Sequence, residues 1–170
     1  MPRPLREQVV VITGASSGIG RDTARRLGER GASLVLAARN EEALASLARE
    51  IQQAGGKAHV VPTDVADWQQ VERLAEAAVD RFGRIDTWIN NAGLYLASRV
   101  EDMTVDDAAR LMQVNVMGTI YGTKAALPHL IRQGQGTIIN VGSAVGARGI
   151  PLLAAYSASK FAVKGFTEAL

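Results

Sequence analysis

A glycine-rich turn that joins an apolar run to a helical segment constrains this chain more than any other feature. Residues 9–12 (Val-Val-Val-Ile) are typical of a buried strand, and residues 13–20 follow as Thr-Gly-Ala-Ser-Ser-Gly-Ile-Gly. Glycine allows a positive φ and a close approach to the backbone, while a helix N-terminus presents free N–H groups and a positive dipole end. This context predicts a site for the pyrophosphate of a dinucleotide. The alternative is a tight turn with close helix packing.

Short apolar runs alternate with helix-periodic segments along the rest of the chain. Further strands are expected at residues 33–38, 57–61, 87–90 and 137–141, and helices from the turn to about residue 30 and over about 40–54, 67–82, 106–131 and 154–170. In the last helix, Phe161, Gly165 and Phe166 are expected to pack inward. The alternation predicts an α/β fold, a doubly wound, Rossmann-like parallel sheet, in a single domain over residues 1–170.

Composition excludes several classes of binding partner and of catalytic site. The 19 basic and 17 acidic side chains are scattered, so neither nucleic acid nor an anionic membrane is expected as a partner. The absence of cysteine excludes disulfides and thiol catalysis, and His59 and His129 are far apart in sequence, so no metal site is expected. The start of the chain lacks an apolar signal region and no run approaches membrane-spanning length, so a cytoplasmic location is the default expectation.

Two side chains near the end of the chain suggest acid–base chemistry. Tyr156 and Lys160 are four residues apart in a predicted helix, so both emerge on one face. Reduction of a ketone requires an acid for the oxygen and the reverse oxidation requires a base; a tyrosine hydroxyl beside an ammonium group can serve as both. Ser143 follows the fifth strand, where it can donate to a substrate oxygen. Alone, the Tyr-x-x-x-Lys spacing is common in amphipathic helices.

Four segments together carry a resemblance to a known family. They are the turn at 13–20, Asn-Asn-Ala-Gly at 90–93, Ser143 and the Tyr-x-x-x-Lys pattern at 156–160, in this order. The chain thereby resembles the classical short-chain dehydrogenase/reductase family. The resemblance implies an oxidoreductase that transfers a hydride between a nicotinamide cofactor and a carbonyl or secondary alcohol substrate.

The resemblance also implies the catalytic roles. Residues that match Ser143, Tyr156 and Lys160 polarise the substrate, transfer the proton and anchor the nicotinamide ribose, so Ser143 and Tyr156 are expected to contact substrate. Asn115 matches an asparagine that holds a water molecule, which relays protons to the lysine. For Asn115 the alternative is a buried amide that bends its helix and is satisfied by neighbouring backbone.

The expected cofactor contacts come from the glycine turn, from the strand ends and from the last helix. They are Gly14, Ser16, Ser17, Gly18, Ile19, Gly20, Arg39, Asp64, Val65, Asn91, Ala92, Gly93, Tyr156 and Lys160.

Arg39 and Asp64 are expected to contact the adenosine half of the cofactor. The second strand ends in Ala38-Arg39-Asn40, with a guanidinium group in place of the acid that would repel a 2′-phosphate, so NADP(H) is expected in preference to NAD(H). The alternative is that Arg39 is a solvated surface residue. Asp64 resembles the family's acid that accepts from the adenine amino group, and its alternative is a cap of the turn before Asp67.

The resemblance covers about the first two-thirds of a typical family member. The last two strands and the substrate lid are expected to be missing, so the domain is expected to be incomplete at its C-terminus, as a part or a shortened form of a longer polypeptide. The fifth strand would then be an unpaired edge. Family members commonly form dimers or tetramers, so a homo-oligomer is expected. The alternatives to a working enzyme are a dinucleotide-binding sensor or scaffold without turnover, or an inactive fragment.

Overall fold

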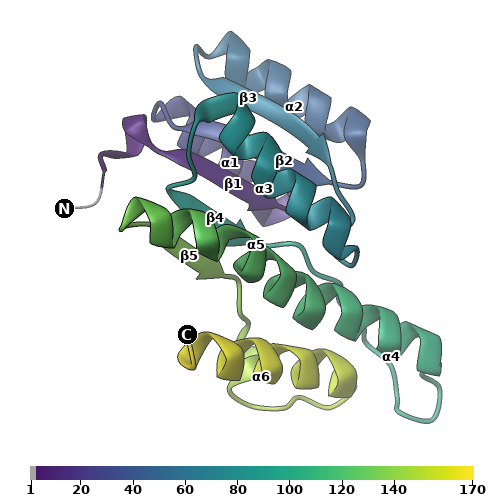
Figure 1. Cartoon of the computed structure of the whole chain (residues 1–170). Helices are drawn as coiled ribbons and strands as arrows, with labels where there is room; N and C mark the ends of the chain where they lie inside the picture. The colour runs from purple at the N-terminus through teal and green to yellow at the C-terminus, as the bar shows by residue number, and fades with distance from the viewer. Residues whose placement is uncertain (1–2) are drawn as a thin grey trace.

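The structure, a computed structural model, describes residues 3–170 and forms one parallel sheet with helices on both faces (Figure 1). The strands are β1 (Val9–Thr13), β2 (Ser33–Ala38), β3 (Lys57–Pro62), β4 (Thr87–Asn90) and β5 (Thr137–Asn140), in the order β3-β2-β1-β4-β5. The helices are α1 (Gly18–Glu29), α2 (Glu41–Gln53), α3 (Trp68–Phe82), α4 (Val105–Met112), α5 (Gly118–Gln133) and α6 (Ala154–Glu168). Three short turns complete the elements: η1 (Leu5–Glu7), η2 (Gln113–Met117) and η3 (Ala144–Gly146).

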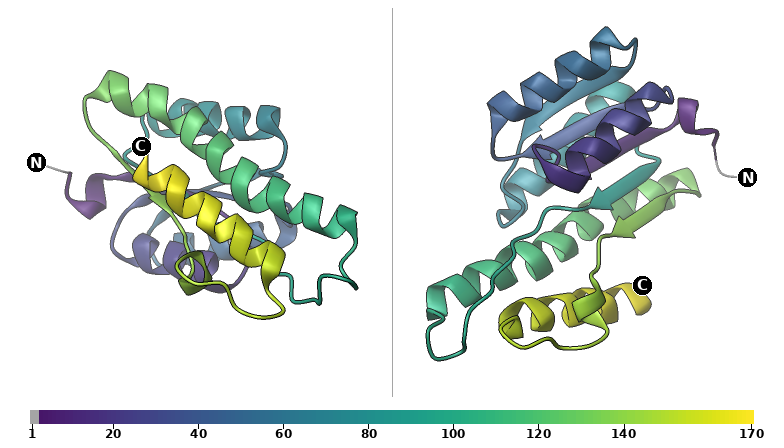
Figure 2. Two further views of the ribbon diagram at one scale, coloured as in Figure 1. Left: turned by 90° about the horizontal axis from the view of Figure 1, so that it is seen from below. Right: turned by 180° about the vertical axis from the view of Figure 1, so that it is seen from behind.

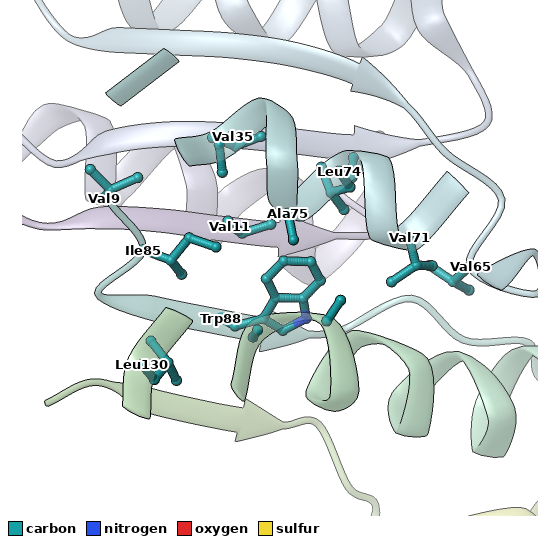
Figure 3. Close-up of a cluster of buried hydrophobic side chains, with 14 of the residues drawn as sticks. Val9, Val11, Val35, Val65, Val71, Leu74, Ala75, Ile85, Trp88 and Leu130 are labelled. Atoms are coloured by element: carbon teal, nitrogen blue, oxygen red, sulfur yellow. The ribbon is translucent and has the colours of Figure 1, made fainter. Parts of the chain in front are cut away.

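The alternation of side chains along the strands divides the interior into two layers. Val9 and Val11 of β1 join a buried cluster with α3 and α5, whereas Val10 and Ile12 join a second cluster with α1 and α2. Figure 3 shows the first cluster, with the indole of Trp88 pointing from β4 toward α3. Figure 2 shows α1 and α2 on the opposite face. The doubly wound Rossmann-like architecture is therefore confirmed.

The element boundaries agree closely with those expected from sequence. β2 and β4 have the predicted bounds, and β1, β3 and β5 differ by one residue at one end. Gly31, Gly55 and Gly83 take a positive φ just after α1, α2 and α3, as helix-terminating glycines do. β5 pairs with β4 and with no other strand among residues 3–170, so it is an edge strand as expected.

The long helical stretch predicted over 106–131 is interrupted. Its middle, η2, is a π turn in which the N–H of Gly118 donates to the carbonyl of Gln113. The extra residue per turn was not predicted, since composition and periodicity change little across it. α4, η2 and α5 still form one long rod (Figure 1).

Helix α6 lies beside this rod, which both views of Figure 2 show. It buries Ser159, Lys160 and Val163 against its neighbours. The prediction that Phe161 and Gly165 pack inward is wrong, because the two residues lie on the outer face and Phe161 is 45% exposed. Phe166 is half-buried. None of the helices in residues 3–170 combines the length and the apolarity needed to cross a membrane.

Candidate functional site

A groove with a volume of about 400 Å³ lies at the carboxyl ends of strands β1 to β4. This is the edge of a parallel α/β sheet at which ligands bind. Eleven of the residues expected to contact the cofactor line it: Gly14, Ser16, Ser17, Ile19, Gly20, Arg39, Asp64, Val65, Asn91, Ala92 and Gly93. Gly18, Tyr156 and Lys160 are not among its lining residues.

The glycine turn serves both packing and access. A Cβ on Gly14 would lie 2.7 Å from the Cα of Ala92, and one on Gly20 would collide with the carbonyl oxygen of Gly14. A Cβ on Gly18 would meet no atom of residues 3–170 within 4 Å. Gly14 and Gly20 therefore permit close packing, which was the alternative interpretation, and Gly18 faces open space.

The N-terminus of α1 is accessible at this open point. Within residues 3–170, the N-cap residue Ser17 makes no side-chain hydrogen bond to the start of the helix. The first N–H groups of a helix lack partners inside the helix and carry the positive end of its dipole. An anionic group at Gly18 would meet these donors, so the turn fits the pyrophosphate of a dinucleotide.

Thr13, which was not predicted as a functional residue, joins two walls of the groove. Its hydroxyl accepts from the N–H groups of Asn91 and Ala92, both at 3.1 Å. The amide of Asn91 in turn donates to the carbonyls of Thr13 (3.0 Å) and Gly14 (3.2 Å). The end of β1 is thus fixed to the end of β4. The threonine that opens the glycine motif was the available signal, but strand propensity alone explains its presence.

Asp64 lies in the groove beside two arginines. Its Oδ1 accepts from the N–H of Ala66 at 3.0 Å, and its Oδ2 accepts from Nη2 of Arg110 at 2.7 Å. Burial opposes ionisation, but these donors outweigh it and lower the pKa of Asp64, with a further contribution from the charge of Arg39. The turn contact considered as the alternative is present. Asp67, rather than Asp64, caps α3.

Arg110 is a groove residue that the sequence analysis missed. It comes from α4 and is 46 positions from Asp64 in sequence, so no local spacing relates the two. Arg39 is exposed at the end of β2, and no ion pair of Arg39 occurs among residues 3–170.

Asn115 is buried in the π turn, with only 1% of its surface exposed. Its Oδ1 accepts from the N–H of Leu94 at 2.7 Å, and its Nδ2 donates to the carbonyl of Leu94 at 2.9 Å and to Oγ of Ser159 at 3.0 Å. The amide is therefore satisfied by neighbouring groups, as the structural alternative required. Because these bonds reach two other segments, Asn115 connects the loop after β4 with α6.

Ser159, like Thr13 and Arg110, was not predicted from the sequence. It is fully buried, and its hydroxyl accepts from Asn115 and donates to the carbonyl of Tyr156 at 2.7 Å. The Tyr-x-x-x-Lys spacing concerns only the two ends of that segment. Ser159, which directly precedes Lys160, bonds to the backbone of the turn of α6 that carries both ends.

Lys160 is the buried cation of the site. It is 7% exposed, its Nζ donates to the carbonyl of Val141 at 2.8 Å, and burial lowers its pKa. The ammonium is 5.9 Å from the ring centre of Tyr156, which is half-buried and packs edge-on against Tyr95 at 5.2 Å. The two residues therefore emerge on one side of α6, and Lys160 reaches the segment that follows β5.

Ser143 lies in that same segment, directly after β5, and is exposed. Its Oγ accepts a long hydrogen bond of 3.4 Å from the N–H of Val145. An accepted bond leaves the hydroxyl hydrogen available for donation.

The histidines lie elsewhere. His59 is on β3, and His129 on α5 contacts Arg132 at 2.9 Å; burial lowers the pKa of His129. Among residues 3–170, no three histidine, aspartate or glutamate side chains gather closely enough to hold a metal ion.

Comparisons with known proteins agree with this geometry. The model of the short chain dehydrogenase family matches residues 8–170. An uncharacterized oxidoreductase of Bacillus subtilis, YxnA, is 47% identical over 169 residues, which are 99% of this chain and 48% of that protein. The chain thus spans about half the length of this relative.

Two solved structures are also similar. A short chain dehydrogenase/reductase from Burkholderia phymatum in complex with NAD is 37% identical with a TM-score of 0.93, over 95% of this chain and 58% of that one. An alcohol dehydrogenase from the archaeon Thermococcus sibiricus complexed with 5-hydroxy-NADP is 34% identical with a TM-score of 0.90, over 95% and 69%.

Proposed function

Since this chain belongs to the short-chain dehydrogenase family, we propose that its residues 1–170 are a single dinucleotide-binding domain of an oxidoreductase that interconverts a carbonyl and a secondary alcohol. The observation that carries the proposal is the buried ammonium of Lys160, held at the end of β5 one helical turn from Tyr156. Burying an unpaired cation is costly, so such a group is a candidate for chemistry.

The groove fits a nicotinamide dinucleotide. The open space at Gly18 and the uncapped start of α1 suit a pyrophosphate, and Gly93 and Val65 line the groove beside the strand ends. When bound, the cofactor supplies or accepts the hydride. Tyr156 and Lys160 are proposed to contact its ribose as well as to act in catalysis.

The chain's own groups supply the proton chemistry. The hydroxyl of Tyr156 donates its proton to the carbonyl oxygen during reduction and accepts a proton from the alcohol during oxidation. The ammonium of Lys160 lies 5.9 Å from the ring centre of Tyr156, on the same side of α6. The free hydrogen of the Ser143 hydroxyl donates to the substrate oxygen and stabilises the charge that develops there. Asn115 is proposed to hold the relay water. Its side chain is already bonded to Leu94 and Ser159, and its carbonyl oxygen, which accepts from the Thr119 hydroxyl at 2.8 Å, can accept a second hydrogen bond.

The expected cofactor is NADP(H). Arg39 stands at the end of β2, and its neighbour Asn40 is engaged in capping α2 through the N–H of Ala43. Arg39 is thus the charged group available to a 2′-phosphate at this strand end. The two solved relatives hold NAD in one case and 5-hydroxy-NADP in the other, so family membership alone leaves the choice open. Arg39→Asp should reverse the ratio of NADPH to NADH turnover. A preference for NADH in the unaltered protein would contradict the cofactor assignment.

The catalytic assignment is tested with a panel of ketones and aldehydes, by following nicotinamide absorbance. Tyr156→Phe should lower turnover by about 10²–10⁴-fold and leave dinucleotide affinity unchanged, because only the acid–base group is removed. Tyr121→Phe is the matched control, since Tyr121 packs edge-on against Trp68 and neither residue lines the groove. Retained turnover in Tyr156→Phe removes this residue from the mechanism. Dinucleotide binding without turnover of any carbonyl would instead favour a sensor.

A further inference from the structure

One end of the groove contains two cations and one anion. Arg39 enters from the end of β2, Asp64 from the end of β3 and Arg110 from α4. Arg110 and Asp64 form an ion pair at 2.7 Å, with 39% and 29% of their side chains exposed. Arg39 lies close enough for its charge to act on Asp64, yet it is exposed and outside this pair.

This arrangement bears on a conflict within the proposed cofactor site. Asp64 accepts a hydrogen bond from an adenine amino group most strongly as a carboxylate, whose two oxygens act only as acceptors. A 2′-phosphate carries close to two negative charges and would lie in the same part of the groove, so an uncompensated carboxylate would repel it. The carboxylate would also compete with the phosphate for the guanidinium of Arg39.

The ion pair resolves the conflict. Arg110 occupies Oδ2 of Asp64 and the N–H of Ala66 occupies Oδ1, so both oxygens have a donor that is not Arg39. The pair is charge-neutral, and Arg39 then contributes the net positive charge at this end. A carboxylate oxygen can accept more than one hydrogen bond, so the pair does not block an adenine amino group.

We propose that Arg110 is a positioning residue that determines cofactor choice: by compensating the charge of Asp64, it keeps Arg39 available to a 2′-phosphate. The inference rests on the proposed function, in particular on the binding of a 2′-phosphorylated adenine nucleotide at Arg39. Arg110 acts through Asp64 and requires no contact of its own with the phosphate.

The test uses the adenosine halves of the two cofactors, so that the readout is binding rather than turnover. Adenosine 2′,5′-bisphosphate and 5′-AMP are titrated into the 170-residue chain by calorimetry at low salt. The unaltered chain should prefer the bisphosphate. Arg110→Gln should weaken bisphosphate binding about fivefold and change 5′-AMP binding less than about twofold, because only the former carries the additional charge. Arg110→Lys retains the charge and should retain most of the preference.

A double-mutant cycle with Asp64→Asn separates action through Asp64 from direct attraction. If Arg110 acts by keeping Asp64 from pairing with Arg39, then the loss of bisphosphate binding caused by Arg110→Gln should be clearly smaller in the Asp64→Asn background, because no carboxylate is left there to compete for Arg39. An undiminished loss in that background would mean that Arg110 attracts the phosphate directly, and the inference would be overturned. An equal loss of both nucleotides in Arg110→Gln would overturn it too, since that result indicates a structural role.

A control pair is available on α1. Arg26 and Asp22 form an ion pair at 2.7 Å outside the groove, and Arg26→Gln changes the net charge equally. It should leave the ratio of the two affinities unchanged. If the unaltered chain binds 5′-AMP more tightly than the bisphosphate, the proposed cofactor preference fails and this inference fails with it. If the unaltered chain prefers the bisphosphate and Arg110→Gln keeps the ratio, only the inference fails.

Discussion

The central strands and the edge strand β5 differ in how they hold the parts of the site. β1 and β4 are buried on both faces, and the glycine turn and the Asn91–Gly93 segment follow them directly. β5 alternates between exposed and half-buried residues, with Ile139 43% exposed, and leads to Ser143 and then to α6. The groove is thus fixed by close backbone packing, whereas the residues proposed for acid–base chemistry follow a strand with little packing of its own.

Hydrogen bonds compensate for the sparse packing around β5 and α6. The amide of Asn90 donates to Asn140 at 2.8 Å, and the amide of Asn140 donates to the hydroxyl of Thr167 in α6 at 2.9 Å. Lys160 itself donates to Val141. A few polar contacts therefore hold α6 to the end of the sheet. The groove should tolerate less added volume than α6, and α6 should respond more to charge.

The largest effect is expected from added volume in the groove. In Gly20→Ala the new methyl group collides with the backbone carbonyl of Gly14, which cannot move without separating β1 from Ala92. Overpacking of this kind costs about 2 kcal/mol of unfolding free energy. If the displaced turn must return to its original position to bind the pyrophosphate, dinucleotide affinity should also fall. A cost of about 2 kcal/mol corresponds to a loss of roughly 30-fold. Urea unfolding and a nucleotide titration measure the two quantities.

Gly20→Ala discriminates between the two interpretations of the glycine turn. Lower stability with unchanged dinucleotide affinity would mean that the turn serves packing alone and that the pyrophosphate binds elsewhere. Unchanged stability would contradict the claim that the groove is fixed by backbone contact.

The contrast between features set by neighbouring residues and contacts between distant residues also explains what the sequence could predict. Strand ends and helix ends are marked by local signals, such as Asn40 and Asp67 at helix starts and glycines of positive φ. The eleven groove residues were predicted from the glycine turn and the strand ends together with the family resemblance. The Asp64–Arg110 pair and the Asn115–Ser159 bond join residues far apart in sequence, and no spacing rule reaches them. Helical periodicity assigned Phe161 to an apolar face, but it does not reveal which face a neighbour covers.

A second effect is expected from the buried charge in α6. Burial lowers the pKa of Lys160 from its ordinary value of 10.5, so at neutral pH the folded chain contains an ammonium that opposes folding. Between the lowered pKa and 10.5 the unfolded chain binds more protons, and stability rises with pH through that window. Lys160→Met removes this rise. Its stability relative to the unaltered chain should be greatest near neutral pH and decline as the pH approaches 10.5.

Lys164→Met is the matched control for this pH dependence. Lys164 is on the same helix, is half exposed and faces Glu168 at 3.7 Å. Its substitution should shift stability by a nearly constant amount over the same pH range, as measured by urea midpoints at several pH values. If the two variants gave parallel curves, the ammonium of Lys160 would be hydrated in solution, and α6 would be held less closely to β5 than the structure indicates.

The smallest effect, and of opposite sign to that of Gly20→Ala, is expected from Gly165→Ala. Gly165 lies inside α6 on its exposed face, and a Cβ there would meet no atom of residues 3–170 within 4 Å. Replacing a helical glycine by alanine reduces the entropy lost on folding, so we expect a gain of about 0.5–1 kcal/mol in unfolding free energy and no change in dinucleotide affinity. A fall in the urea midpoint would mean that the outer face of α6 packs against another surface in solution. In that case the contrast between a closely packed groove and a loosely covered α6 would be a property of the isolated chain only.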